Sequence, residues 1–128
     1  MLVESAGAIN GSGNDQDNYI FGNSSSNTLH GGGGADVIFG GAGSDVLSGG
    51  AGNDFFGFAP SFGTDTITDF TSGDRIAFDH AVFASFAAVQ ARMLQVGADT
   101  VIVFSGETTL TVQNTVATAL TASDFLFY

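Results

Sequence analysis

The chain has 128 residues, enough for one domain with a single hydrophobic core. Hydrophobic residues make up 44%, which argues against a disordered polar tail, and the lack of cysteine excludes disulfides and thiolate metal sites. Arg75 and Arg92 are the only Lys or Arg residues against 13 acidic ones, and the net charge of −11 argues against a nucleic-acid partner, whose phosphates would be repelled. This charge indicates cationic ligands instead.

The first residues show no targeting signal. Met1 to Gly13 contains neither a basic nor an apolar segment, so the sequence predicts no cleavable signal peptide. No apolar run approaches the roughly 20 residues that cross a bilayer, so no membrane span is expected.

A nine-residue repeat follows. Residues 31–57 read three times, without a gap, as G-G-x-G-x-D-x-U-x, where U is apolar. Two earlier copies carry Asn18 and Asn27 in place of the sixth-position Asp. Two later copies, after a two-residue insertion, contain Asp65 and Asp74. We number these copies as rows 1 to 7: residues 13–21, 22–30, 31–39, 40–48 and 49–57, then the rows of Asp65 and Asp74. The apolar eighth positions are Ile20, Leu29, Ile38, Leu47, Phe56, Ile67 and Ile76.

Each row predicts a turn followed by a short strand. Glycines at the first, second and fourth positions permit positive φ, so that the turn carbonyls can face a common point. The last three positions form a strand whose eighth side chain faces inward. Such short strands are stable only when stacked, as in a solenoid. Two rows make one coil, so each row is expected to lie against the second row after it.

This stacking brings carboxylates together. The facing pairs are Asp36 with Asp54, Asp45 with Asp65, and Asp54 with Asp74, with Asp69 near the last pair. Two carboxylates about 4 Å apart repel by roughly 1–4 kcal/mol. A divalent cation would reverse this repulsion, and calcium suits a flexible set of carboxylate and carbonyl oxygens. We therefore expect the roll to fold only with calcium.

The rows resemble the RTX (hemolysin-type) calcium-binding repeats of serralysin proteases, toxins, lipases and alginate epimerases. The resemblance covers Gly13 to Phe78 and rests on the three gapless repeats. It implies that ions lie between the turns of rows n and n+2, about three to five in all. The implied ligands are Gly31, Gly32, Gly33, Gly34, Asp36, Gly40, Gly41, Ala42, Gly43, Asp45, Gly49, Gly50, Ala51, Gly52, Asp54, Asp65, Asp69 and Asp74. Rows 1 and 2 depart from the family pattern because they lack the carboxylate.

The period stops at Asp79. Ser85 is expected to cap a helix over residues 86–96, with Gly97 as its stop. Residues 100–104 and 109–113 predict a hairpin. Odd rows would expose an apolar outer surface formed by Tyr19, Phe21, Val37, Phe39 and Phe55, too apolar to face water uncovered. We therefore expect the helix and hairpin to cover it.

These expectations combine into one all-β domain, residues 1–128. It is a parallel β-roll of nonapeptide repeats (13–78) followed by a C-terminal cap (79–128) with one short helix, antiparallel strands and a secretion signal. The ending Asp124 to Tyr128, an acidic residue before several apolar ones, resembles that of type I secretion substrates. The resemblance implies a bacterial protein that stays unfolded in the cytosol, uses the type I export machinery and folds at the cell surface or in the medium. Extracellular modules bind calcium at about 10⁻⁴–10⁻³ M.

Other functions stay open. A polysaccharide-binding module, similar to those of alginate epimerases, would contact a glycan through the roll surface. An incompletely covered apolar sheet would instead allow self-association. No zinc motif, nucleophile elbow or Ser/His/Asp grouping is present, so no enzymatic activity is expected, and His30 and His80 are expected at the surface.

Overall fold

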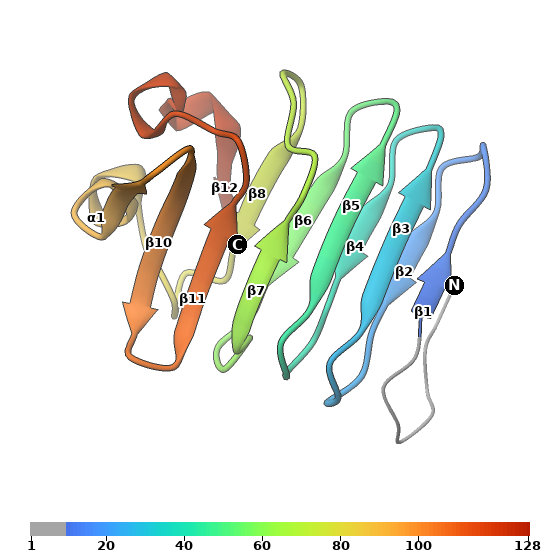
Figure 1. The fold of residues 1–128 in the computed structure, drawn as a ribbon, viewed down its shortest axis with the longest axis horizontal. Coiled ribbons are helices and arrows are strands. Elements are labelled where there is room, and N and C mark those ends of the chain that lie inside the picture. The colour runs from blue at the N-terminus through green and yellow to red at the C-terminus, as the bar shows by residue number, and fades with distance from the viewer. Residues whose placement is uncertain (1–9) are drawn as a thin grey trace.

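The computed structural model describes residues 10–128, so the signal-peptide prediction falls mostly outside the described residues. Two parallel sheets face each other and carry alternate rows (Figure 1). Odd rows form a sheet of β2 (Tyr19–Phe21), β4 (Val37–Phe39), β6 (Phe55–Phe58) and β8 (Arg75–Phe78). Even rows form a second sheet of β3 (Thr28–Gly32), β5 (Val46–Gly50) and β7 (Thr64–Ile67). The predicted parallel β-roll is confirmed.

The strand register follows the repeat. Ile38 pairs with Phe56 across 18 residues, as expected for two rows per coil. Leu47 pairs with Ile67 across 20 residues, which places the two-residue insertion before β7. One further strand, β1 (Asn10–Ser12), pairs with β3 and was not predicted. Its inward position is Gly11, so it lacks the apolar signal that marks the other rows.

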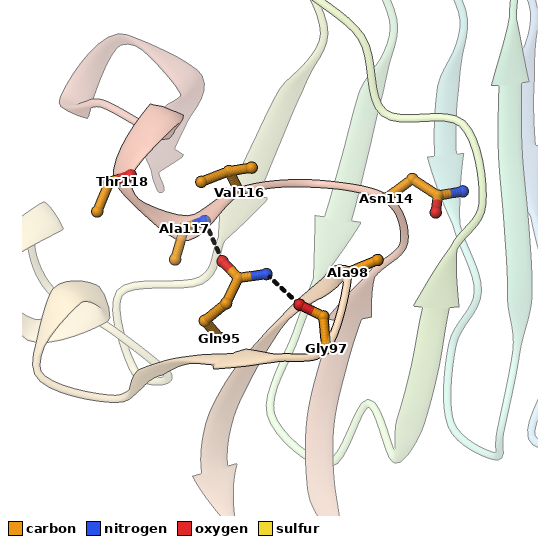
Figure 2. A pocket seen from close by; sticks show the side chains of 7 residues that line it. All are labelled: Gln95, Gly97, Ala98, Asn114, Val116, Ala117 and Thr118. Carbon is orange, nitrogen blue, oxygen red and sulfur yellow. Dashed lines mark hydrogen bonds between the residues drawn. The ribbon is translucent and has the colours of Figure 1, made fainter.

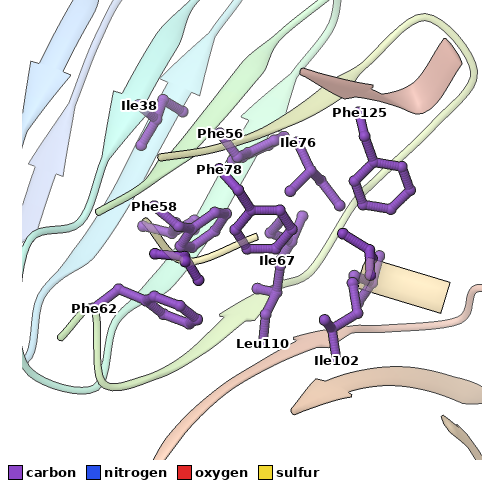
Figure 3. Close-up of a cluster of buried hydrophobic side chains, with 14 of the residues drawn as sticks. Ile38, Phe56, Phe58, Phe62, Ile67, Ile76, Phe78, Ile102, Leu110 and Phe125 are labelled. Atoms are coloured by element: carbon purple, nitrogen blue, oxygen red, sulfur yellow. The ribbon is translucent and has the colours of Figure 1, made fainter. Parts of the chain in front are cut away.

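The core lies between the two sheets (Figure 3). All seven eighth-position side chains are fully buried, as predicted. At the C-terminal end of the roll the core becomes aromatic, because Phe58, Phe62 and Phe78 pack together with ring centroids 5.1 to 6.3 Å apart. Ile102 and Leu110, from the segment after the roll, complete this end of the core.

The segment after the roll extends the sheets and does not cover them. β11 (Thr108–Val112) pairs in parallel with β7, and β10 (Asp99–Ser105) pairs antiparallel with β11, as the predicted hairpin requires. β12 (Phe125–Phe127) pairs in parallel with β8. The prediction that the helix and hairpin cover the odd-row sheet was therefore wrong. Without β11 and β12, the edges of β7 and β8 would leave backbone N–H and C=O groups without partners. Pairing of these edges took precedence over covering apolar side chains.

The helix is shorter than predicted. Ser85 caps α1 (Phe86–Gln90) by accepting a hydrogen bond from Ala88 N, as expected, but the helix ends at Gln90. The remaining predicted helical residues form β9 (Met93–Val96), which pairs antiparallel with β10. Gly97, with φ of +61°, belongs to the turn of this β9–β10 hairpin.

Two short 3-10 segments, η1 (Ala117–Ala119) and η2 (Ala122–Asp124), lead into β12. Within residues 10–128, none of the helices has the length and apolar character required to cross a bilayer.

Candidate metal-binding turns

The turns stack in two columns, one along each edge of the roll (Figure 1). Odd rows contribute one column, which contains Asp36, Asp54 and Asp74, and even rows contribute the other, which contains Asp45 and Asp65. Strand pairing across 18 or 20 residues holds each turn directly against the turn of the next coil. The repeat alone thus places equivalent turn residues beside one another.

Glycine has two separate roles in these turns. The second- and fourth-position glycines adopt left-handed conformations, for example Gly32 at φ +107° and Gly34 at φ +85°. The first-position glycines do not, which corrects the prediction of positive φ there. Glycine is needed at the first position for space, because a Cβ on Gly49 would collide with Oδ2 of Asp54. The same collision would occur in rows 3 and 4.

The sixth-position carboxylates form a hydrogen-bonded ladder along each column. In each case Oδ1 accepts a bond from the backbone N–H of the sixth residue one coil earlier. The distances are 2.8 Å (Asn18 to Asp36), 2.9 Å (Asp36 to Asp54) and 3.0 Å (Asp54 to Asp74) in one column, and 2.7 Å (Asn27 to Asp45) and 2.9 Å (Asp45 to Asp65) in the other. All five carboxylates are at most 1% exposed.

Three of these carboxylates leave the second oxygen without a partner. Oδ2 of Asp36, Asp45 and Asp54 is buried and accepts no hydrogen bond. Leaving a buried charged acceptor unpaired is costly, because it has lost its water and gained nothing in exchange. These oxygens therefore fit a cation, and they lie in the three gapless repeats.

Burial also disfavours ionisation of these carboxylates. Desolvation raises the pKa of Asp45 and Asp54 to about 6 and that of Asp65 to about 8, and it raises the pKa of Asp36 as well. For Asp54 the neighbouring carboxylates add to this effect. Without metal, the protein must therefore either bind protons at these carboxylates or bear the free-energy cost of their mutual repulsion. A divalent cation would remove both costs.

The turns bring together the residues implied as ligands of the first ion. Ala51 N donates to the carbonyl of Gly32 at 2.9 Å, and the Cα of Gly52 lies against the carbonyl of Gly34. These contacts stack the row-3 turn, with Asp36, on the row-5 turn, with Asp54. In the other column, Gly63 lies against the carbonyl of Gly43.

Within residues 10–128, no three acidic, histidine or cysteine side chains converge on one point. A cation in these turns would therefore depend mainly on backbone carbonyls, the hard oxygen ligands that calcium accepts.

Asp69 makes specific hydrogen bonds that the sequence did not predict. Its two carboxylate oxygens accept hydrogen bonds from Gly49 N at 3.0 Å and Gly50 N at 2.8 Å. Asp69 thus fastens the row-7 turn to the row-5 turn by direct hydrogen bonds, and its role as a metal ligand stays a prediction. Gly63, at φ +89°, was missed. It lies two residues before Asp65 and is the fourth-position glycine of row 6, which the repeat could have identified.

An open hollow of about 730 Å³ lies away from the turns, between the β9–β10 turn and the segment after β11 (Figure 2). Gln95 connects its walls, because its Nε2 donates to Gly97 O and Asp99 O while its Oε1 accepts from Ala117 N. The lining residues are Gln95, Gly97, Ala98, Asn114, Val116, Ala117 and Thr118. None of them is ionisable, so this hollow offers no acid, base or metal ligand of the usual kinds.

Comparisons with known proteins agree with this geometry. The model of the RTX calcium-binding nonapeptide repeat matches four copies, over residues 11–47 and 21–56. Comparison with curated proteins gives no match.

Two solved structures resemble the chain. The crystal structure of the extracellular lipase LipA from Serratia marcescens has a TM-score of 0.72 at 22% identity over 89% of this chain. The AlgE6R2 subunit of the Azotobacter vinelandii mannuronan C5-epimerase has a TM-score of 0.63 at 26% identity, over 91% of both chains. This chain spans only 20% of the lipase, so that similarity concerns the fold alone.

The repeat match, the stacked turns and the parallel roll therefore coincide. The matched repeats contain the three turns with unpartnered carboxylate oxygens. Residues 11–56 of this chain belong to the RTX calcium-binding nonapeptide repeat family.

Proposed function

We propose that this chain is an extracellular module of a bacterial protein that folds when calcium binds between its stacked turns. The observation that carries the proposal is the set of three buried carboxylate oxygens without a partner, on Asp36, Asp45 and Asp54. A calcium ion between two turns would accept these oxygens together with the turn carbonyls. The free energy of binding then becomes free energy of folding.

The residues proposed to hold the ions are those of the family pattern. Gly32, Gly34 and Asp36 would share one ion with the row-5 turn, through Gly49, Ala51 and Asp54. The row-4 turn, with Gly41, Gly43 and Asp45, would share another with the row of Asp65. The row-5 turn, through Gly50, Gly52 and Asp54, would share a third with Asp69 and Asp74. Because each site combines charged and neutral oxygens, we expect the weaker affinities of extracellular calcium modules, about 10⁻⁴–10⁻³ M.

A calcium titration followed by far-UV circular dichroism tests this proposal. The chain in EGTA at neutral pH should show little β signal and should gain it cooperatively as calcium is added. Magnesium at the same concentration is the control and should give much less signal, because it demands a rigid octahedral site. A full β signal in EGTA at neutral pH would refute the proposal.

We further propose that residues 13–78 are the calcium-dependent roll and that the cap, residues 79–128, carries a type I export signal at its end. The contacts of β12 support this proposal. Phe125 is buried, its ring stacks on Phe78 at 6.2 Å and it contacts Phe86 at 5.4 Å. The end of the chain is thus incorporated into the folded sheet. Before folding it would be accessible to the export machinery, and folding outside the cell would prevent its return.

An export assay tests the signal. The chain and a variant lacking Asp124 to Tyr128 would be produced in a bacterium with a type I exporter, and each would be quantified in the medium and in the cells. The truncated chain should remain in the cells. Equal export of both chains would exclude these residues as the signal, whatever the calcium dependence of folding.

Self-association is a second candidate function, favoured by the uncovered odd-row sheet. Tyr19 is 66% exposed, Phe21 39% and Tyr128 48% on the outer surface of this sheet. An apolar hollow of about 250 Å³, lined in part by Phe39 and Tyr128, lies beside them. A Cβ on Gly57 would collide with the Phe39 ring, so glycine at this position makes room for that ring on the outer surface. Sedimentation velocity in calcium should show dimers that the Phe21→Ser variant weakens. A wild-type chain that stays monomeric at high concentration would exclude this function.

A polysaccharide contact has less support. Arg75 lies at the start of β8, whereas Arg92 lies between α1 and β9, so the two arginines do not form one basic groove. Calorimetric titration with alginate should therefore show no binding, and saturable binding would restore this alternative.

A further inference from the structure

The turns of rows 1 and 2 are closed by a different set of interactions from those of rows 3 to 5. In row 1, Oδ1 of Asn18 accepts a hydrogen bond from Asn14 N at 2.9 Å, and Oδ1 of Asn14 accepts one from Gln16 N at 2.9 Å. Row 2 repeats this pattern at the same positions. Asn27 Oδ1 accepts from Asn23 N at 2.9 Å, and Asn23 Oδ1 accepts from Ser25 N at 2.9 Å.

These asparagines occupy the second and sixth positions, where rows 3 to 5 have Gly and Asp. Gly32, Gly41 and Gly50 are left-handed at the second position, whereas Asn14 and Asn23 are not. The backbone of the first two turns therefore follows another path, fixed by side chains that bond to nearby N–H groups. The amide oxygen at the sixth position is satisfied inside its own turn, whereas Oδ2 of Asp36, one coil later, is not.

The first two turns still stack on the next coil. Asn18 N and Asn27 N donate to Asp36 and Asp45, and Gly33 N donates to Asn14 O at 2.9 Å. The fifth-position side chains add one bond each, because Asp17 accepts from Ala35 N at 2.7 Å and Ser26 accepts from Ser44 N at 3.2 Å. Neutral amides at the sixth position avoid the repulsion that burdens the later pairs of carboxylates.

We propose that the turns of rows 1 and 2 close without a cation, and that calcium binding begins between rows 3 and 5 in one column and between rows 4 and 6 in the other. The asparagine turns then form a metal-independent end of the roll, on which the row-3 and row-4 turns stack. This inference rests on the proposed calcium binding and limits it to part of each column.

The number of calcium ions bound per chain tests this inference. Calorimetric titration and elemental analysis of the folded protein would compare the wild type with two variants of the full chain. The first, Asn18→Ala with Asn27→Ala, should bind as many ions as the wild type. The second combines Asn14→Gly, Gln16→Gly and Asn18→Asp in row 1 with Asn23→Gly, Ser25→Gly and Asn27→Asp in row 2. It restores the family pattern in both rows and should bind more ions. Circular dichroism in saturating calcium verifies that each variant is folded.

Each outcome is decisive. Loss of an ion in the alanine variant would show that the amides are ligands and would overturn the inference. An unchanged ion count in the restored variant would show that those turns already held ions, and this also overturns it. A wild-type chain that binds no calcium at all is a different result, because it refutes the proposed function itself. If the alanine variant does not fold, the restored variant still gives the test.

Discussion

Replacing Asp54 by asparagine should have opposite effects on stability with and without calcium. Asp54 lies in the middle of its column, where Oδ1 accepts from Asp36 N at 2.9 Å and its own N–H donates to Asp74 at 3.0 Å. Asparagine keeps both hydrogen bonds and the side-chain shape. It replaces the unpartnered, negatively charged Oδ2 with a neutral amide NH2 group.

The magnitudes follow from the burial of this carboxylate. Its pKa is raised from 3.8 to about 6, and each unit corresponds to about 1.4 kcal/mol between the two protonation states. Near pH 7.5 without metal, loss of the charge should therefore contribute up to about 3 kcal/mol, and the buried amide NH2 should cost about 1–2 kcal/mol, so the variant should be more stable by about 1–2 kcal/mol. In calcium it lacks a charged ligand, and we expect affinity to fall at least about tenfold, or 1.4 kcal/mol per ion.

The assay is far-UV circular dichroism of both proteins in EGTA and in saturating calcium, with urea unfolding where the protein is folded. Asp54→Asn should retain more β signal than the wild type in EGTA and should unfold at lower urea in calcium. Glu107→Gln is the matched control, because it changes the net charge equally at an exposed position in the β10–β11 turn. Destabilisation of the same size in both conditions would refute the reasoning, since Asp54 would then act only as a hydrogen-bond acceptor.

Three further predictions concern acidity, space and the cap. Burial raises the pKa of Asp45 from 3.8 to about 6 and that of Asp65 from 3.8 to about 8. Protonation of these carboxylates therefore stabilises the metal-free roll fully below pH 3.8, and this stabilisation is lost as the pH rises through 6 and 8. In EGTA, the β signal should therefore increase when the pH is lowered from 8.5 to about 5, and a signal that falls would contradict this. Gly49→Ala should destabilise the roll by more than about 2 kcal/mol in calcium, because its Cβ collides with a buried carboxylate, whereas Gly106→Ala, with open space around it, should change stability by less than about 0.5 kcal/mol. Phe125→Ala should cost about 3–5 kcal/mol in urea unfolding with calcium, because the ring is buried against the roll, and a loss below about 1 kcal/mol would show that β12 is dispensable for folding.

The nine-residue period was sufficient to predict the roll. It gave the seven inward side chains, the pairing of alternate rows and the position of the insertion, because each of these follows from counting residues along a repeat. The stacking of Asp36 on Asp54 follows from the same count. The period also contained Gly63, although the deviation of row 6 from the consensus hid it.

Other features of the turns depend on the path of the backbone in three dimensions. Space for Asp54 Oδ2 explains Gly49, five residues earlier in the same turn, and the spacing of the repeat does not reveal that contact. The hydrogen bonds within the asparagine pairs are local. Their relation to metal binding becomes apparent only when they are compared with the unpartnered carboxylate oxygens of rows 3 to 5.

The cap was the part that the sequence described least well. Residues 93–96 were predicted as part of the helix, but pairing with β10 makes them a strand. The apolar outer surface of the odd-row sheet suggested a cover, yet β11 and β12 joined the sheet edges instead. A repeat specifies its neighbours through local spacing. The placement of a non-repeating segment depends on which unpaired strand edges and open core surfaces it meets in three dimensions, because those determine the largest gain in hydrogen bonds and buried area.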